Sequence, residues 1–260
     1  AFNRYLQDSD NVKKLQRVFP VMITTCISAH KLGNPEPLFD MTIIDEASQC
    51  NVAISLVPII RGSKLMLVGD PQQLNPVILL DDISNQKLRR KYHIADEYDY
   101  VKNSIYKTYL ACDAVSDEVL LRNHYRCNKK IIGFNNKKYY NSKLQIKTKS
   151  EEPEPLVYID VKNDRTDIKN TSPAEVYEVL EYALHNKDKS IAVITPFVNQ
   201  KNLIEQKIKE NKLDNLVCGT VHAFQGDEKD VVLFSTALSE RTGAGTYQWL
   251  KNNKELINVA

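Results

Sequence analysis

Two stretches of the sequence decide the fold: TIIDEASQC (residues 42–50) and LMLVGDPQQLNP (residues 65–76). Each begins as a short apolar run and ends in a group of polar side chains. Short apolar runs bounded by turn residues are typical of strands buried in a parallel sheet. The polar groups therefore lie at the carboxyl ends of two strands, where open α/β sheets bind their ligands.

The composition is that of a globular protein with one large or two ordinary domains, since 42% of the 260 residues are hydrophobic and 26% are charged. The net charge of +2 is too small to indicate a nucleic-acid partner, so charge must be judged from local clusters. Five cysteines without CxxC spacing argue against a disulfide framework or a zinc site, which favours a cytoplasmic protein. No apolar run approaches the roughly 18 residues of a membrane span.

Short apolar runs alternate with helical patterns along the chain, which predicts parallel sheets covered by helices. We expect a capped helix in residues 171–186, where Ser172 is the N-cap and Glu175 completes a capping box, and a second helix in residues 198–212. Eight strands, enough for two sheets, are expected at residues 21–27, 39–46, 64–70, 118–123, 156–161, 190–196, 216–221 and 230–237.

A polar, tyrosine-rich segment at residues 81–113 interrupts the alternation and is predicted to be a helical insertion. We place the domain boundary close behind it, with a first domain of residues 1–115 and a second of residues 116–260.

The adjacent acids Asp45 and Glu46 can divide the work of hydrolysis. One carboxylate would hold a magnesium ion through water, and the other would orient or deprotonate an attacking water. The alternative is that the pair caps a helix that starts near Ser48. A glutamine of the second stretch, Gln72 or Gln73, can accept from a water and donate to a phosphate oxygen at once.

Six motifs taken together resemble the helicase core of superfamily 1, in its Upf1-like branch. The resemblance implies an α/β fold of two RecA-like parallel-sheet lobes of the P-loop NTPase type, the first incomplete. It also implies an ATP-dependent helicase or translocase that moves on single-stranded DNA or RNA. The motifs are TTCISA (24–29), DEASQ (45–49), GDPQQLNP (69–76), LRNHYRCN (121–128), ITPFVNQ (194–200) and GTVHAFQGDEKDVVLFS (219–235).

The resemblance assigns roles at a nucleotide. Asp45 would coordinate Mg²⁺ through water, Glu46 would act as the general base, and Gln73 would contact the γ-phosphate of ATP. Arg126 would be an arginine finger from the second lobe that neutralises charge on the transferring phosphoryl group. Glu228 would reach the ribose. Asp70 and Gly226 complete the expected nucleotide site.

The resemblance also indicates polynucleotide contacts, through hydroxyl and amide groups that donate to backbone phosphates regardless of base. They are Thr24, Thr25, Ser28 and Asn75 in the first lobe and Thr220, His222 and Gln225 in the second. Residues 122–149 hold nine Lys or Arg and no acid, interleaved with Tyr125, Phe134, Tyr139 and Tyr140. This mixture suits phosphates and stacked bases, but it also fits a solvated helix face.

The sequence departs from the family pattern at two motif positions and in one missing motif. Asn75 stands where a second proline is usual, and His124 stands near the place of a glutamine. No glycine is followed by lysine, so the phosphate-binding sequence GxxxxGK[ST] is absent, and the final INVA stops short of an arginine-containing motif.

We therefore expect an excised, monomeric piece of a longer helicase that is inactive alone. The alternatives are a nucleotide-blind binding module for nucleic acid and a metal-dependent nuclease built on Asp45, Glu46 and Asp70.

Overall fold

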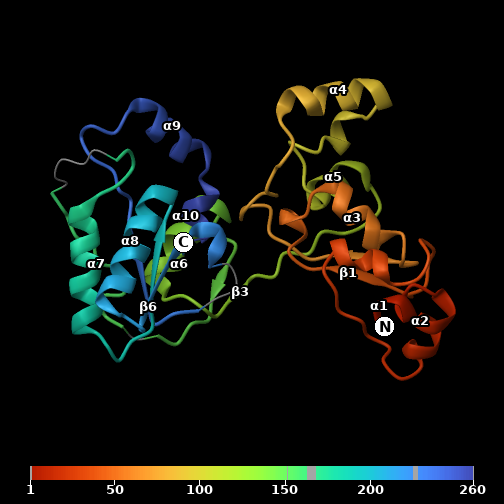
Figure 1. The fold of residues 1–260 in the computed structure, drawn as a ribbon, viewed down its shortest axis with the longest axis horizontal. Helices are drawn as coiled ribbons and strands as arrows, with labels where there is room; N and C mark the ends of the chain where they lie inside the picture. The colour runs from red at the N-terminus through yellow and green to blue at the C-terminus, as the bar shows by residue number, and fades with distance from the viewer. Residues whose placement is uncertain (1, 151, 163–167, 225–227, 260) are drawn as a thin grey trace. The chain divides into compact units, whose positions relative to one another are not determined.

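Every strand pair in the described part of the chain is parallel, as the alternation of apolar runs and helical patterns predicts. The computed structural model describes residues 2–150, 152–162, 168–224 and 228–259. These residues form two units, residues 1–119 and residues 120–260, each with its own core (Figure 1). The predicted α/β fold of RecA-like type is confirmed, but with three sheets among the described residues instead of the expected two.

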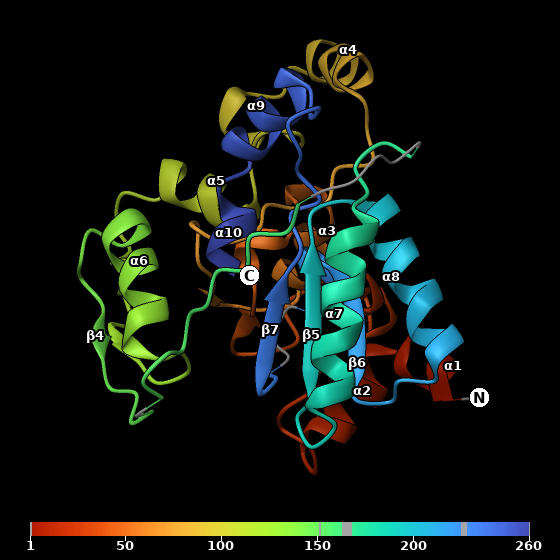
Figure 2. The ribbon, with the colours of Figure 1, turned by 90° about the vertical axis from the view of Figure 1, so that its left-hand side faces the viewer.

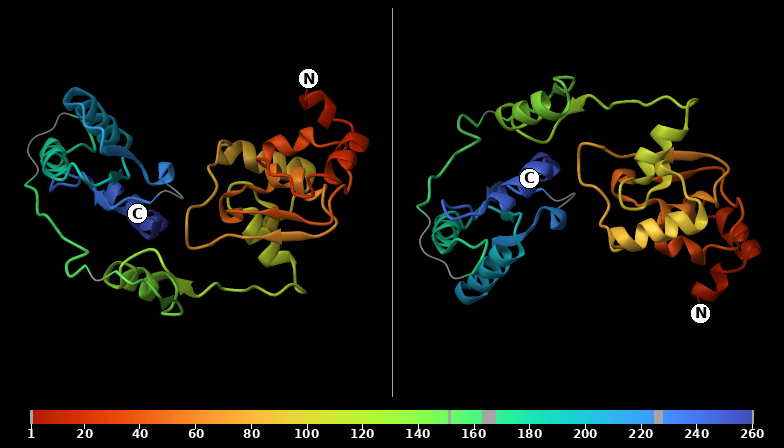
Figure 3. Two further views of the ribbon diagram at one scale, coloured as in Figure 1. Left: turned by 90° about the horizontal axis from the view of Figure 1, so that it is seen from below. Right: turned by 90° about the horizontal axis from the view of Figure 1, so that it is seen from above.

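Unit 1 is built around a two-stranded sheet, whose strands run side by side in Figure 3. Strand β1 (Thr42–Ile44) pairs with β2 (Leu65–Leu67), and α3 (Val52–Ile59) connects them. The predicted insertion is helical, with α4 (Asp82–Tyr92) and α5 (Ile105–Cys112). The remaining elements of unit 1 are α1 (Phe2–Leu6), α2 (Ser9–Gln16) and the short 3-10 helices η1 (Ile27–Lys31), η2 (Ala47–Gln49) and η3 (Asp96–Tyr98).

The small core of unit 1 lies on one face of this sheet. Ile44, Ala47, Val52 and Ile105 are buried together there. On the other face the register partners Ile43 and Met66 are 61% and 47% exposed. Unit 1 therefore presents apolar surface on a strand pair that its own described residues leave uncovered.

Arg61 fastens the loop after η1 to the end of α3. Its guanidinium, 5% exposed, donates to four backbone carbonyls and has no carboxylate partner among the described residues. The distances to the acceptor oxygens are 2.9 Å at Leu32, 2.7 Å at Val57, 3.4 Å at His30 and 3.3 Å at Gly33. This arrangement satisfies the buried charge with dipoles, while burial lowers the pKa of Arg61.

Unit 2 contains a three-stranded sheet in the order β6-β5-β7. Strand β5 (Ile191–Thr195) lies in the centre, flanked by β6 (Leu216–Thr220) and β7 (Val231–Phe234) (Figure 2). Helices α7 (Pro173–His185) and α8 (Val198–Asn211) cover one face. The other elements are β3 (Asn123–His124), β4 (Gln145–Ile146), α6 (Lys129–Tyr139), η4 (Val221–Ala223), α9 (Ala244–Asn252) and α10 (Glu255–Val259).

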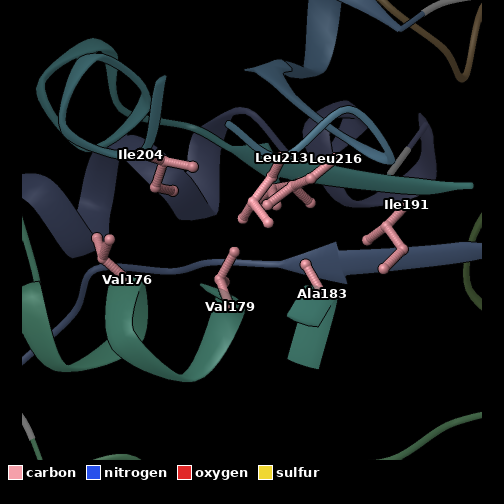
Figure 4. Packing of buried hydrophobic residues seen from close by; sticks show 8 residues of the cluster. Val176, Val179, Ala183, Ile191, Ile204, Leu213 and Leu216 are labelled. Atoms are coloured by element: carbon pink, nitrogen blue, oxygen red, sulfur yellow. The ribbon is translucent and has the colours of Figure 1, made fainter. Parts of the chain in front are cut away.

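The core of unit 2 forms where α7 and α8 meet the central sheet (Figure 4). Val179 and Ala183 of α7 face Ile191 of β5, and Ile204 enters from α8. All five residues of β5 are buried, so the face opposite α7 and α8 is covered as well. Full burial on both faces explains why β5 is apolar from Ile191 to Ile194 without alternation.

The capping prediction for α7 is half right. Ser172 Oγ accepts from the Glu175 amide at 3.2 Å, as expected for an N-cap. Glu175, however, does not close a capping box, and its carboxylate instead accepts from the Ser235 hydroxyl and the Ala237 amide. The Ser172 amide donates to the fully buried Gln200 side chain at 2.8 Å. Hydrogen bonds to residues distant in the sequence have therefore replaced the local contact between Glu175 and the Ser172 amide that a capping box requires.

Three expected strands are wrong or displaced. Residues 21–25 and 156–161 carry no strand, and residues 118–123 contribute only Asn123 to β3. Their apolar side chains stay exposed, as at Ile23 and Tyr158, and no ladder pairs these segments among the described residues. Apolar composition without burial does not specify a strand.

Among the described helices, none combines the length and the apolar character of a membrane span.

Candidate functional site

The loops after β1 and β2 contact each other directly at the carboxyl edge of the unit 1 sheet. The register pairs Ile44 with Leu67. Beyond that pair the Val68 amide donates to the Ile44 carbonyl at 2.9 Å, and the Ala47 amide donates to the Val68 carbonyl at 2.8 Å. Asp45 and Glu46 are thereby held beside the loop that follows β2, as expected from strand order.

Gly69 makes this close approach possible. A Cβ at Gly69 would lie 2.8 Å from the Ser48 backbone nitrogen and 3.1 Å from that of Ala47. The next amide, that of Asp70, donates to Ser48 Oγ at 3.3 Å. Gly69 and Asp70 of the second motif therefore pack against Ala47 and Ser48 of the first motif. This contact joins the two motifs into one site.

Asp45 and Glu46 are both exposed, and neither forms an ion pair with a described cation. The Glu46 amide donates to Asp45 Oδ1 at 2.9 Å, and Gln49 Nε2 donates to Glu46 Oε2 at 2.9 Å. Glu46 has a φ of 51°, a left-handed conformation that is uncommon outside glycine and that clusters at functional sites.

The alternative that Asp45 and Glu46 cap the following helix holds only for the backbone position. Glu46 is the N-cap residue of η2, but its side chain makes no capping hydrogen bond. The N-cap of α3 is Asn51, whose Oδ1 accepts from the Ile54 amide at 3.0 Å, and no side chain caps η2. Neither carboxylate is therefore used in a side-chain cap of η2 or α3.

Asp70 organises the loop that carries Gln73. Its carboxylate accepts from the Gln72 amide at 2.9 Å and from Gln73 Nε2 at 3.0 Å. Leu74 is buried directly behind and anchors the turn. Gln73 is thus held in place by Asp70 on the same edge as the two acids.

In unit 2 the structure brings Arg126 and Glu228 together. Arg126 Nε donates to Glu228 Oε1 at 2.8 Å, although 102 residues separate them, and the side chains are 58% and 68% exposed. Both had been assigned to the nucleotide, so their pairing places two expected nucleotide contacts at one point of unit 2.

His124 supports the turn that carries Arg126, a role that sequence reasoning missed. Burial, followed by the nearby charge of Arg126, lowers the pKa of the His124 imidazole. A neutral ring suits its contact, because Nε2 accepts from the Cys127 amide at 2.8 Å. The departure from the family pattern at His124 therefore has a local structural use.

The expected polynucleotide contacts of unit 1 have partners within the chain. Thr25 Oγ1 accepts from the Ser28 amide at 3.1 Å, while Thr24 is exposed. Asn75 Oδ1 accepts from Lys107 Nζ at 2.8 Å. A local structural role and a phosphate contact are both compatible with these groups.

In unit 2, Thr220 ends β6 at the carboxyl edge of the sheet and is partly exposed. The backbone of His222 belongs to η4. Gln225, expected to contact polynucleotide, and Gly226, expected at the nucleotide, lie outside the described residues. The edge that ends in Thr220 remains the candidate surface for polynucleotide in this unit.

The basic, aromatic run of residues 122–149 is not one surface. Tyr125 and Phe134 are exposed, but Tyr139 is buried and its hydroxyl donates to the Lys254 carbonyl at 3.2 Å. Lys130 Nζ donates to the Pro153 carbonyl at 2.6 Å. The suggestion that Tyr139 stacks on bases is wrong, because its ring belongs to the core.

Mg²⁺ prefers oxygen ligands and is usually held by one or two carboxylates together with substrate phosphates. The paired loops supply exposed carboxylate oxygens of that kind at Asp45 and Glu46, so the donor set fits. The described residues contain no group of three or more His, Cys, Asp or Glu that could hold a metal. A nuclease centre made of Asp45, Glu46 and Asp70 is therefore not found in them.

Parallel strands that end in paired polar loops define an α/β protein with a ligand site at the carboxyl edge of its sheet. Two family models, each described as an AAA domain, match residues 101–260 and residues 6–81. The chain belongs to this AAA domain family. These matches, together with the helicase relatives, confirm the resemblance to a superfamily 1 helicase core.

Three curated relatives illustrate the match. The chain is 24% identical to the DNA replication ATP-dependent helicase/nuclease DNA2 of Gallus gallus, over 96% of this chain and 25% of that protein. It is 25% identical to the RNA helicase Mov10l1 of Mus musculus, over 92% and 23%. It is 28% identical to the uncharacterized ATP-dependent helicase MJ0104 of Methanocaldococcus jannaschii, over 85% and 34%. The chain spans about a quarter to a third of the length of these relatives.

Proposed function

We propose that this chain is part of an ATP-dependent helicase or translocase that moves on single-stranded nucleic acid. The observation that carries the proposal is the contact between the DEAS and GD loops, which gathers Asp45, Glu46 and Gln73 at one sheet edge. An exposed acid pair beside a glutamine supplies three of the groups used in phosphoryl transfer to water: a metal ligand, a base and a contact to the γ-phosphate.

Within this proposal each side chain has one task. Asp45 would hold Mg²⁺ through water, and the bound ion would neutralise charge on the phosphate oxygens. Glu46 would accept a proton from the attacking water, and Gln73 would orient the γ-phosphate through the amide that Asp70 positions. Arg126 would neutralise charge on the transferring group, and Glu228 would contact the ribose. Gly226 would complete the nucleotide contacts.

Polynucleotide would contact the hydroxyl, amide and imidazole groups of seven residues: Thr24, Thr25, Ser28, Asn75, Thr220, His222 and Gln225. Such donors bind the sugar-phosphate backbone without reading the base. DNA and RNA are both compatible with them, and the names of the relatives include a helicase of each kind. All five cysteines are unpaired, which supports a reducing compartment such as the cytoplasm.

The direct test is nucleotide binding by the 260-residue chain. Isothermal titration with ATP should show Mg²⁺-dependent binding that Asp45→Ala weakens and Glu46→Gln preserves, because the second variant keeps shape and hydrogen bonding while losing basicity. If both variants bound ATP equally well and without Mg²⁺, Asp45 and Glu46 would not belong to the nucleotide site. ATPase assays with and without single-stranded DNA or RNA should show no appreciable turnover, since the sequence contains no GxxxxGK[ST] loop.

The same samples separate the rival functions. A binding module would bind nucleic acid with strong salt dependence and ignore ATP. A nuclease would cut DNA with Mg²⁺ in the absence of ATP. In a longer protein that carries this sequence together with a phosphate loop, Arg126→Ala should lower turnover by about 10³ to 10⁵ while leaving ATP bound.

A further inference from the structure

Two of the five cysteines lie against each other beside the core of unit 1. Cys26 directly precedes η1, and Cys50 directly follows η2. Both side chains are partly buried and pack against the same four core residues of unit 1, and a hydrogen bond joins the two thiols. Sulfur atoms in such contact need only a small further approach to reach the S–S bonding distance of about 2.0 Å.

Arg61 independently fixes the two elements that follow these cysteines. Its guanidinium donates to the His30 carbonyl in η1 at 3.4 Å and to the Val57 carbonyl in α3 at 2.7 Å. Helix α3 begins just after Cys50, and η1 begins just after Cys26. The two thiols therefore meet between segments whose spacing is set by a separate set of hydrogen bonds.

The other three cysteines are placed differently. Cys112 is exposed at the end of α5, where it hydrogen-bonds with Tyr98. Cys127 and Cys218 belong to unit 2. A separate thiol can be capped or over-oxidised, whereas two thiols in contact can form a disulfide within the chain. The contact with Cys50 thus distinguishes Cys26 chemically from these three thiols.

We propose that Cys26 and Cys50 form a reversible disulfide when the protein meets a hydroperoxide. Disulfides in reducing compartments are mostly transient and redox-sensing, which agrees with two thiols that are free at rest. The bond would tie η1, which carries the expected phosphate contact Ser28, to η2, which directly follows Asp45 and Glu46. The inference goes beyond the proposed function and does not depend on it.

The reaction balances with hydrogen peroxide as the oxidant. The Cys26 thiolate attacks one peroxide oxygen, the O–O bond breaks, and the hydroxide that leaves takes up the thiol proton and becomes water. Cys26 is then a sulfenic acid. The Cys50 sulfur attacks the Cys26 sulfur, the S–O bond breaks, and the departing hydroxide takes the Cys50 proton as a second water. Together the two sulfurs give up the two electrons that reduce the peroxide.

The order of the two attacks follows from the state of Cys50. Burial, followed by the neighbouring Cys26, raises the pKa of Cys50 to about 12, so this group is almost wholly protonated at neutral pH. The thiolate is the nucleophile, which leaves the first attack to Cys26. Cys50 then acts as the resolving thiol, because its contact with Cys26 offsets its low thiolate fraction.

The experiment treats the reduced 260-residue chain with hydrogen peroxide, once under native conditions and once in concentrated urea. Alkylation of the remaining thiols stops the reaction, and peptide mass spectrometry locates any disulfide. Dimedone, added to separate samples, traps sulfenic acids. Cys26→Ser and Cys50→Ser are compared with the matched control Cys112→Ser, and circular dichroism checks that each variant is folded.

We expect the native chain to lose two of its five thiols and to yield the disulfide between Cys26 and Cys50, which dithiothreitol should reverse. Cys112→Ser should form it to the same extent. Cys50→Ser should accumulate a dimedone adduct at Cys26, and Cys26→Ser should leave Cys50 unmodified. In urea the same treatment should give a mixture of pairings, because the fold no longer selects the partners.

Two results would overturn the inference. If the folded parent chain accumulated sulfinic acid at Cys26, or kept both thiols reduced, Cys26 and Cys50 would not be redox partners. If the disulfide formed in urea but not in the folded chain, the fold would not hold the two sulfurs in reach of each other. Either result leaves the proposed nucleic-acid function standing.

Discussion

The Glu175 carboxylate accepts a hydrogen bond of 2.6 Å from the Ser235 hydroxyl, so the first turn of α7 is tied to the residue that follows β7. The same carboxylate accepts a hydrogen bond from the backbone amide of the buried Ala237. Ala237 has a φ of 47°, a left-handed conformation that this hydrogen bond helps to stabilise. This contact holds the loop after β7 as it leaves the sheet.

Replacing Glu175 by Ala should lower the free energy of unfolding of unit 2 by about 2 to 4 kcal/mol, because two donors lose their acceptor. Glu175→Gln keeps an acceptor oxygen and should lose less. Urea unfolding followed by Trp249 emission measures both. Glu178→Ala, an exposed acid of the same helix, should change stability by less than about 0.5 kcal/mol. Equal losses at both positions would contradict a specific role for Glu175.

Gly69→Ala should separate the two loops of the candidate site. The added Cβ meets backbone nitrogens that cannot rotate away, so we expect a loss of about 1 to 3 kcal/mol in unit 1 and weaker Mg²⁺-dependent ATP binding. Hydrogen exchange of the Ala47 and Ser48 amides should become faster. The matched control is Gly133→Ala within α6, where nothing lies within 4 Å, and a gain of about 0.5 to 1 kcal/mol is expected there. Unchanged exchange in Gly69→Ala would show that the loops are not in contact.

Arg61→Met should destabilise unit 1 by at least about 3 kcal/mol, because four backbone carbonyls lose a charged donor. Arg61→Lys should rescue little, since a single ammonium cannot reach carbonyls on both segments. Circular dichroism during urea unfolding gives the measurement. Arg90→Met, at an exposed position of α4, serves as the control and should be close to neutral. Full rescue by lysine would show that charge alone matters at Arg61.

The five thiols should react with iodoacetamide in an order set by burial. Burial, followed by the neighbouring Cys26, raises the pKa of Cys50 to about 12, and burial raises that of Cys218 to about 12. The thiolate is the reactive form, so at pH 8 about one in 10⁴ of these groups would be reactive. Cys112 is exposed and should be modified first. Mass spectrometry of the native chain gives the order, and raising the pH should accelerate Cys50 and Cys218. Rapid labelling of Cys50 at pH 8 would contradict its burial.

The parts of the fold that could be predicted are those in which pattern and burial agree. β5, β6 and β7 lie within the predicted ranges, and α7 begins at its predicted cap, because each of these elements packs at least one face against the core of unit 2. Residues 21–25 carry as much apolar character, but Ile23 is almost fully exposed. No local signal distinguishes an apolar run that finds a partner strand from one that does not.

Within the candidate site, sequence could predict which polar groups end the strands but not what they contact. The gathering of Asp45, Glu46 and Gln73 at one edge follows from adjacent parallel strands. The pairing of Arg126 with Glu228 joins residues on segments far apart in the chain, which periodicity does not reveal.

The placement of β5 between two later strands governs the order in which unit 2 assembles during synthesis. The ribosome releases β5 before β6 and β7, so the middle strand emerges with α7 and must wait for both neighbours. The segment from α7 through α8 supplies the local contacts that keep β5 shielded meanwhile. A pause in translation after β5 would therefore leave its four apolar residues, Ile191 to Ile194, open to aggregation, whereas a pause after β7 would not.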